Sequence, residues 1–91
     1  MTIRYRRHAE LRVAALEGEG VVLHLGTRRY YTVSESGLAI LEALAAPHTV
    51  DDLVALLLGR YEVTADAAAA CVDRFLDRCR GADLLATEDE A

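Results

Sequence analysis

The sequence predicts an α+β domain in which a three-stranded antiparallel sheet is followed by three helices, in a winged helix-turn-helix-like arrangement. Hydrophobic residues alternate with a period of two through the first third of the chain, which is typical of half-buried strands. After residue 33 they follow helical spacing instead. The length of 91 residues fits one domain with a single core, and the separation of strands from helices defines the α+β class.

The expected strands lie at residues 9–16, 21–25 and 28–33. The first alternates only in part, the second alternates cleanly, and the third (RRYYTV) is rich in β-branched and aromatic residues. Gly26, in the loop between the last two strands, is expected to supply the positive φ of a tight hairpin turn. We expect His24 to be an exposed strand residue. The three strands are predicted to form a sequential meander.

Each expected helix has a capping signal at its start. Ser34 or Ser36 caps the first helix, and Pro47 ends it. Thr49 caps the second helix, which carries acids in its first turn. Thr64 opens the third helix. The short turn between the second and third helices suggests a helix-turn-helix unit.

The remaining segments complete the expected domain organisation. Gly81 is expected to end the third helix. Residues 1–8 are predicted to form an N-terminal arm, residues 9–86 the folded domain, and residues 87–91 (TEDEA) a loose acidic tail.

The charge distribution excludes several classes of function. All ten basic residues are arginine, and the net charge is −5. Residues 1–33 have a balance of +3 and residues 34–91 one of −8, which disfavours generic nucleic-acid binding. No apolar run reaches the ~18–20 residues of a membrane helix, and no signal peptide is recognised. Two cysteines without an export signal indicate a reduced, cytoplasmic protein.

The sequence offers no recognisable catalytic, metal or cofactor site. Cys71 and Cys79 are eight residues apart on a predicted helix, a rise of about 12 Å, which is too long for a disulfide or one metal ion. The three histidines are scattered, and the serines after the third strand are best explained as helix caps. No nucleophile elbow or glycine-rich phosphate loop occurs. We therefore predict that the domain is not an enzyme and holds no cofactor or metal.

A sequential meander leaves residues 28–33 as an edge strand, whose unpaired backbone groups soluble proteins usually guard. Its two arginines are either that guard or a means of steering a partner. Tyr30 and Tyr31 must point to opposite faces of the sheet. One tyrosine is therefore expected in the core and the other at the surface, although both could simply cover the sheet.

The predicted third helix has an apolar face beside a mixed flank. A helical wheel places Ala68, Val72, Phe75 and Cys79 on one face. The adjacent flank is formed by Ala69, Asp73, Leu76 and Arg80. If this flank borders a groove beside the edge strand, an extended peptide can add a strand there. An edge that stays unused is the alternative.

The order of short motifs resembles the PqqD-like peptide chaperone family, the precursor-peptide recognition elements of ribosomally made, modified peptides. An apolar strand, a glycine turn and an aromatic strand precede a Ser-x-x-Gly helix start, a Thr-Val-x-x-Leu helix and a Tyr-x-Val turn. These motifs are found at Val21–Leu25, Gly26, Tyr30-Tyr31, Ser34–Gly37, Thr49–Leu53 and Tyr61–Val63. The resemblance covers roughly residues 8–86. It departs from the family pattern in lacking a tryptophan in the first helix and in the Ala-Asp inserted after Gly81.

The resemblance implies a non-catalytic protein that binds the leader segment of a precursor peptide as an added strand. Among such proteins it most resembles the stand-alone chaperone of lasso-peptide pathways, which presents the precursor to a leader peptidase and a cyclase. A chaperone of PQQ-type or radical-modified peptide pathways is similar as well. The peptide-binding residues implied are Arg28, Arg29, Tyr30, Tyr31, Thr32 and Val33 on the strand, and Val72, Asp73, Leu76 and Arg80 on the helix.

Two other functions share the predicted fold. A winged-helix DNA-binding protein would use the third helix for recognition, but the arginines of that helix are offset by acids. A structural adaptor would dock on a partner enzyme without binding a peptide. The sequence leaves the oligomeric state open, because an edge strand can also pair with its own copy.

Overall fold

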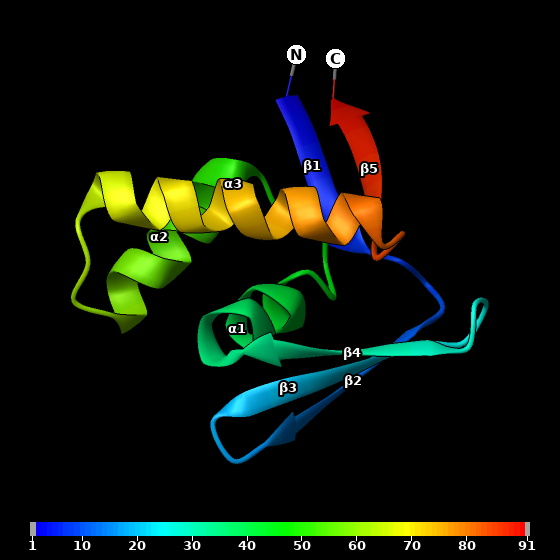
Figure 1. The fold of residues 1–91 in the computed structure, drawn as a ribbon. Coiled ribbons are helices and arrows are strands. Elements are labelled where there is room, and N and C mark those ends of the chain that lie inside the picture. The colour runs from blue at the N-terminus through cyan, green and yellow to red at the C-terminus, as the bar shows by residue number, and fades with distance from the viewer. Residues whose placement is uncertain (1, 91) are drawn as a thin grey trace.

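The computed structural model describes residues 2–90, which fold into two small sheets and three helices (Figure 1). Within this range no helix is long and apolar enough to cross a membrane. The elements, in chain order, are β1 (Thr2–Arg7), β2 (Leu11–Leu16), β3 (Glu19–His24), β4 (Arg29–Ser34), α1 (Glu35–Ala43), α2 (Val50–Arg60), α3 (Ala65–Gly81) and β5 (Leu85–Glu90).

The predicted meander is confirmed as an antiparallel sheet with strand order β2-β3-β4. Glu17 and Gly18, with φ of 26° and 82°, form a two-residue turn between β2 and β3. The next loop is longer than predicted, and its positive φ falls on Arg28 (60°) rather than on Gly26. The reason is that the Arg28 amide donates to the carbonyl oxygen of His24 (2.8 Å), which closes a four-residue loop at Arg28.

The capping residues expected from the sequence start all three helices. Ser34 Oγ accepts a hydrogen bond from an amide in the first turn of α1. Thr49 and Asp52 form a reciprocal capping box at α2, and Thr64 Oγ1 caps α3. These hydrogen bonds satisfy amides that a helix cannot pair internally.

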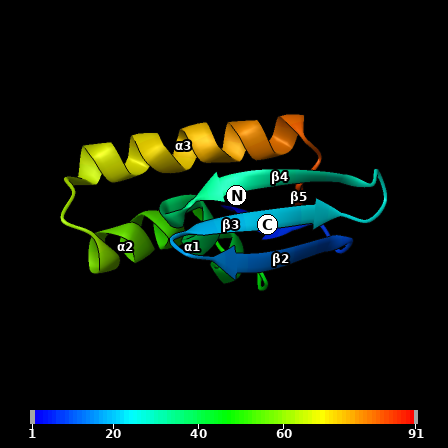
Figure 2. The same ribbon diagram turned by 60° about the horizontal axis from the view of Figure 1, so that its bottom comes forward.

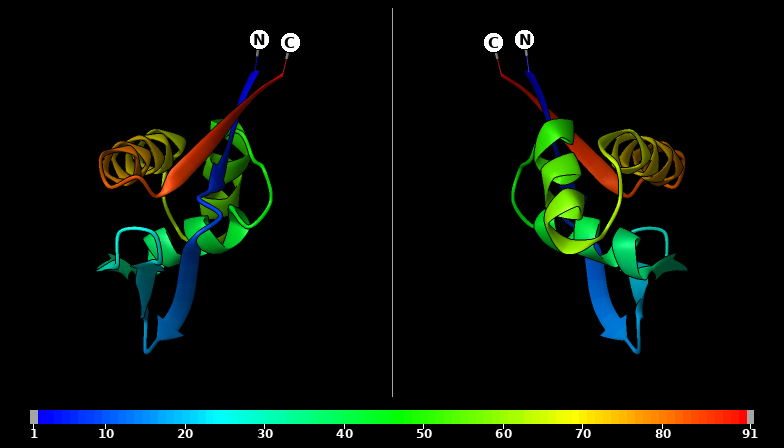
Figure 3. Two further views of the ribbon diagram at one scale, coloured as in Figure 1. Left: turned by 90° about the vertical axis from the view of Figure 1, so that its right-hand side faces the viewer. Right: turned by 90° about the vertical axis from the view of Figure 1, so that its left-hand side faces the viewer.

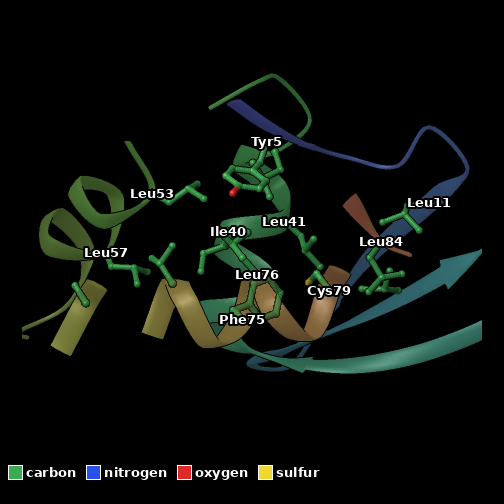
Figure 4. Close-up of a cluster of buried hydrophobic side chains, with 14 residues drawn as sticks. Tyr5, Leu11, Ile40, Leu41, Leu53, Leu57, Phe75, Leu76, Cys79 and Leu84 are labelled. Atoms are coloured by element: carbon green, nitrogen blue, oxygen red, sulfur yellow. The ribbon is translucent and has the colours of Figure 1, made fainter. Parts of the chain in front are cut away.

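The core lies between α1, the inner face of the β2-β3-β4 sheet and the helix pair α2–α3. Figure 4 shows Ile40 and Leu41 of α1 in the middle of this cluster, between side chains of α2 and α3. Its buried members are Tyr5, Leu11, Val22, Ile40, Leu41, Leu44, Leu53, Leu57, Ala68, Val72, Phe75, Leu76, Cys79 and Leu84.

The two chain ends form a second sheet that the sequence did not reveal. Residues 2–7 of the predicted arm are β1, and the expected loose tail lies in β5 up to Glu90, with residue 91 outside the described range. The strands lie side by side and away from the other sheet (Figure 3). Acidic β5 has low strand propensity, but it pairs with arginine-rich β1, where Arg6 Nη1 lies 2.9 Å from Glu88 Oε1.

His24 is buried, with 2 % of its surface exposed, so the prediction of an exposed strand residue was wrong. Its Nδ1 accepts hydrogen bonds from the amides of Gly26 (3.1 Å) and Thr27 (3.3 Å). The side chain is buried because it supplies the acceptor that the β3–β4 loop needs.

Candidate functional site

Strand β4 is an open edge of the three-stranded sheet within residues 2–90. In a two-residue hairpin, the residues that flank the turn form a hydrogen-bonded pair, here Leu16 and Glu19. The N–H and C=O groups of successive residues point to opposite sides of a strand. Starting from the Leu16–Glu19 pair, the β2–β3 and β3–β4 registers therefore determine which backbone groups of β4 face away from β3. The N–H and C=O groups of Tyr30 and Thr32 point away from β3 and are free to pair with another strand.

The side chains of β4 divide between the two faces of the sheet. Tyr30 is 72 % exposed, and Thr32 lies on the same outer face. Tyr31 and Val33 are half-buried and pack against the core on the inner face. The expectation that the two tyrosines separate is confirmed, with Tyr31 as the inner one.

Helix α3 runs alongside β4 (Figure 2), and residues of both elements line a groove between them. The C-terminal half of α3 and β4 enclose a pocket of about 450 Å³. A second pocket, of about 320 Å³, continues toward α1 and shares Phe75 and Arg78 with the first, so the two form one channel, here called the β4–α3 groove. Its lining residues are Tyr31, Thr32, Val33, Ser34, Ser36, Cys71, Arg74, Phe75, Arg78, Cys79, Gly81, Ala82 and Leu84.

The floor of the groove is the ring of Phe75. A Cβ on Gly37 of α1 would lie 2.7 Å from Phe75 Cε1, closer than real side chains approach, and 3.2 Å from Val33 Cβ. Only glycine leaves space for the ring at this depth. The Ser-x-x-Gly helix start noted in the sequence therefore shapes the groove as well as the helix.

The structure brings only some of the predicted site residues to the groove. Val72 and Leu76 are 0 % and 1 % exposed, lie in the core, and are absent from the groove lining. Asp73 and Arg80 are exposed, and Arg80 Nη1 donates to Tyr5 OH of β1 (3.2 Å), on a flank remote from β4. The predicted apolar face of the third helix is buried, but the flank predicted to border the groove was wrong.

The opposite flank of α3 faces the groove. Cys71, Arg74, Arg78 and Ala82 follow one another at intervals of three or four residues and line it together with Phe75. A helical wheel shows both flanks but does not tell which one lies beside β4. The spacing of Arg74 and Arg78 was the available signal, because it places two cations one turn apart beside the apolar stripe.

The two arginines at the start of the strand lie outside the groove. Arg28, in the β3–β4 loop, and Arg29, the first residue of β4, are both exposed. Neither lines the pockets between β4 and α3. Both side chains are free to contact a bound strand that extends past the start of β4, toward the β3–β4 loop.

The two thiols differ in environment. Cys79 is buried, and burial raises its pKa to about 11 although the nearby Arg78 acts in the opposite direction. Cys71 is half-buried, lines the groove, and has its Sγ 4.0 Å from Ser36 Oγ. Because the thiolate is the reactive form, Cys79 is inert near neutral pH.

His8, His24 and Asp83 form the one cluster of potential metal ligands among residues 2–90. His24 Nε2 and His8 Nε2 lie 3.5 Å and 4.0 Å from Asp83 Oδ2. The Nδ1 atom of each ring accepts a hydrogen bond from a backbone amide, that of Glu10 for His8 (3.0 Å) and that of Gly26 for His24. The proton of each neutral ring therefore sits on Nε2. Protonated Nε2 atoms suit a carboxylate rather than a metal ion, and the cluster links the end of α3 to the β3–β4 loop.

The groove and both of its walls fall within a family match. The model for the family described as coenzyme PQQ synthesis protein D (PqqD) matches residues 19–85. The chain belongs to the PqqD family. The matched range includes every residue that lines the groove, and it confirms the resemblance drawn from the sequence motifs. A search of curated proteins gave no match.

Two solved structures share the fold of this PqqD-family chain. One is described as TbiB1 in complex with the TbiA(beta) leader peptide, with a TM-score of 0.79, 23% identity, and coverage of 94% of this chain and 98% of the other. The second is lasso peptide synthetase B1 complexed with the leader peptide, with a TM-score of 0.76, 20% identity, and coverage of 90% and 96%. These similarities confirm the predicted α+β architecture.

Proposed function

We propose that this PqqD-family protein binds the leader segment of a ribosomally made precursor peptide as an additional strand on β4. The observation that carries the proposal is the open edge of β4, with the backbone groups of Tyr30 and Thr32 facing outward, beside a groove that includes a pocket of about 450 Å³. Backbone hydrogen bonds would supply affinity and the groove would supply selection. Both similar structures are described as leader-peptide complexes, which supports this assignment.

The protein acts without catalysis and presents the bound precursor to modifying enzymes, most simply the leader peptidase and cyclase of a lasso-peptide pathway. The name of one similar structure, lasso peptide synthetase B1, supports this pathway. The family description favours PQQ-type peptide modification as the second candidate. Among the described residues, no histidine or carboxylate lines the β4–α3 groove, which supports a binding role, and two free thiols suit the cytoplasm.

A DNA-binding function finds less support in the position of α3. A recognition helix must present basic residues to phosphates and base edges. Here Arg74 and Arg78 face the groove beside β4, and Arg80 is paired with Asp77. A mobility shift at low salt is expected to show no complex with duplex DNA.

Hydrogen exchange of the backbone amides tests the proposal directly. The probe is the leader of a short precursor peptide encoded beside this protein, added until fluorescence polarisation shows saturation. The Tyr30 and Thr32 amides should become protected from exchange, because they donate hydrogen bonds to carbonyl oxygens of the added strand. The matched control is the opposite edge, where the outward amides of Val13 and Ala15 on β2 should be unaffected. Binding without protection of β4, or protection of β2 instead, would contradict strand addition at β4.

A further inference from the structure

The arginines of α3 divide between two faces. Arg80 forms an ion pair with Asp77 and a hydrogen bond to Tyr5 on the flank remote from β4. Arg74 and Arg78 line the β4–α3 groove, and neither has an ion-pair partner within residues 2–90. The groove wall therefore carries two uncompensated guanidinium groups.

These two arginines are the only charged residues that line the groove among the residues described. The other lining side chains are apolar, aromatic, hydroxyl or thiol groups. Glu35 lines a third pocket of about 370 Å³ toward α2, which shares Ser34, Ser36 and Cys71 with this end of the groove, so one acid lies at the end away from Arg78. A chain with a net charge of −5 thus has a locally basic groove, which favours an acidic ligand through electrostatic complementarity.

The spacing of the two cations matches an extended peptide. Four residues along a helix rise about 6 Å, and alternate residues of a strand, which share one face, are about 6.6–6.8 Å apart. A strand paired with β4 and running along α3 can therefore place two same-face side chains opposite Arg74 and Arg78. Guanidinium groups bind carboxylates through paired, charge-assisted hydrogen bonds.

We infer that the groove selects leader peptides that carry two acidic residues at alternate positions, one opposite Arg74 and the other opposite Arg78. This inference rests on the proposed leader-binding function and adds its charge specificity. The two acidic side chains fix the register of the added strand, because a shift by one residue turns both of them away from α3. Glu35, in the pocket toward α2, disfavours a third acidic residue of the leader at the Arg74 end of the groove.

Fluorescence polarisation with the fluorescein-labelled leader of the precursor encoded beside this protein tests the inference. R74Q and R78Q should each weaken binding about two- to fivefold, the range for partly exposed ion pairs, and raised salt should reduce the difference. R12Q, on the outer face of β2 and away from the groove, is the matched control and should bind like the wild type. Changing the two leader acids to amides should weaken binding to the wild type and have little further effect on R74Q/R78Q.

The outcomes separate the two levels of the argument. If the leader binds but R74Q/R78Q binds it as tightly as the wild type, the charge specificity is overturned and the leader-binding function stands. A bound leader without acids at alternate positions also overturns the specificity. If the wild-type protein does not bind the leader at any salt concentration, the proposed function fails, and the specificity fails with it.

Discussion

Gly37 of α1 lies against the ring of Phe75 of α3 so closely that a Cβ would stand 2.7 Å from Phe75 Cε1. The contact joins the helix that follows β4 to the helix that forms the opposite groove wall. The depth of the groove thus depends on one missing methyl group. Substitutions at Gly37 should alter both the stability of the fold and the shape of the site.

Gly37→Ala should lower the free energy of unfolding by about 1–3 kcal/mol, the usual cost of overpacking a core, or displace Phe75 into the groove and weaken leader binding. Thermal unfolding and leader titration measure the two effects. Gly59→Ala in α2 is the matched control, because a Cβ there meets nothing within 4 Å. It should stabilise the protein by about 0.4–1 kcal/mol. A Gly37→Ala variant with unchanged stability and leader affinity would show that the contact is unimportant.

Iodoacetamide should distinguish the two thiols. At pH 8 Cys71 should be alkylated and Cys79 should not, because burial raises the Cys79 pKa to about 11 and leaves almost no thiolate. A bound leader should slow alkylation of Cys71, which lines the groove. Mass spectrometry of the intact protein and of Cys71→Ser measures both effects. Equal rates with and without a saturating leader would place the peptide elsewhere.

The capping box of α2 should contribute a pH-dependent part of stability. The backbone amide of Thr49 donates to Asp52 and lowers the Asp52 pKa below its usual 3.8. A lowered pKa in the folded state means that the stabilisation is fully present above pH 3.8 and is lost as the pH falls through the folded-state pKa.

Asp52→Asn keeps an acceptor but cannot ionise, so the wild type should have the higher Tm above pH 4, and the two Tm values should converge as the pH falls below 3.8. Calorimetry between pH 2 and 6 measures this. A Tm difference that stays constant over that range would show that the charge of Asp52 is not the cause.

The predictable parts of the fold are those with local signals. The caps at Ser34, Thr49 and Thr64 mark helix starts through hydrogen bonds made within one turn. The β1–β5 sheet has no such signal, because its strands are separated by nearly the whole chain and an acidic strand is unfavourable until a basic one lies beside it. The burial of His24 had no sequence signal either, because it depends on how the β3–β4 loop folds over the His24 ring and donates hydrogen bonds to it.

The site was predictable in its strand and not in its helix. The alternation of Tyr30 and Tyr31 is a property of any strand, so the sequence placed one tyrosine inward. The facing flank of α3 depends on packing at a distance. Leu76 is drawn into the core by the buried cluster that includes Tyr5, a residue of a strand that the sequence did not predict. Because Leu76 is buried, Leu76→Asp is expected to unfold the domain, which loss of the folded circular dichroism spectrum would show.

Thr32→Pro tests the strand addition that the proposed function requires. Proline removes the outward N–H of Thr32 without breaking a bond to β3, so the fold should tolerate it as edge strands do, while leader binding should weaken about tenfold through one lost hydrogen bond and the altered strand geometry. Ala15→Pro, at an outward-facing N–H on the opposite edge strand β2, is the matched control and should bind the leader normally. Circular dichroism verifies the fold of both variants, and fluorescence polarisation measures their affinity. A folded Thr32→Pro protein with wild-type affinity would show that this amide takes no part in binding.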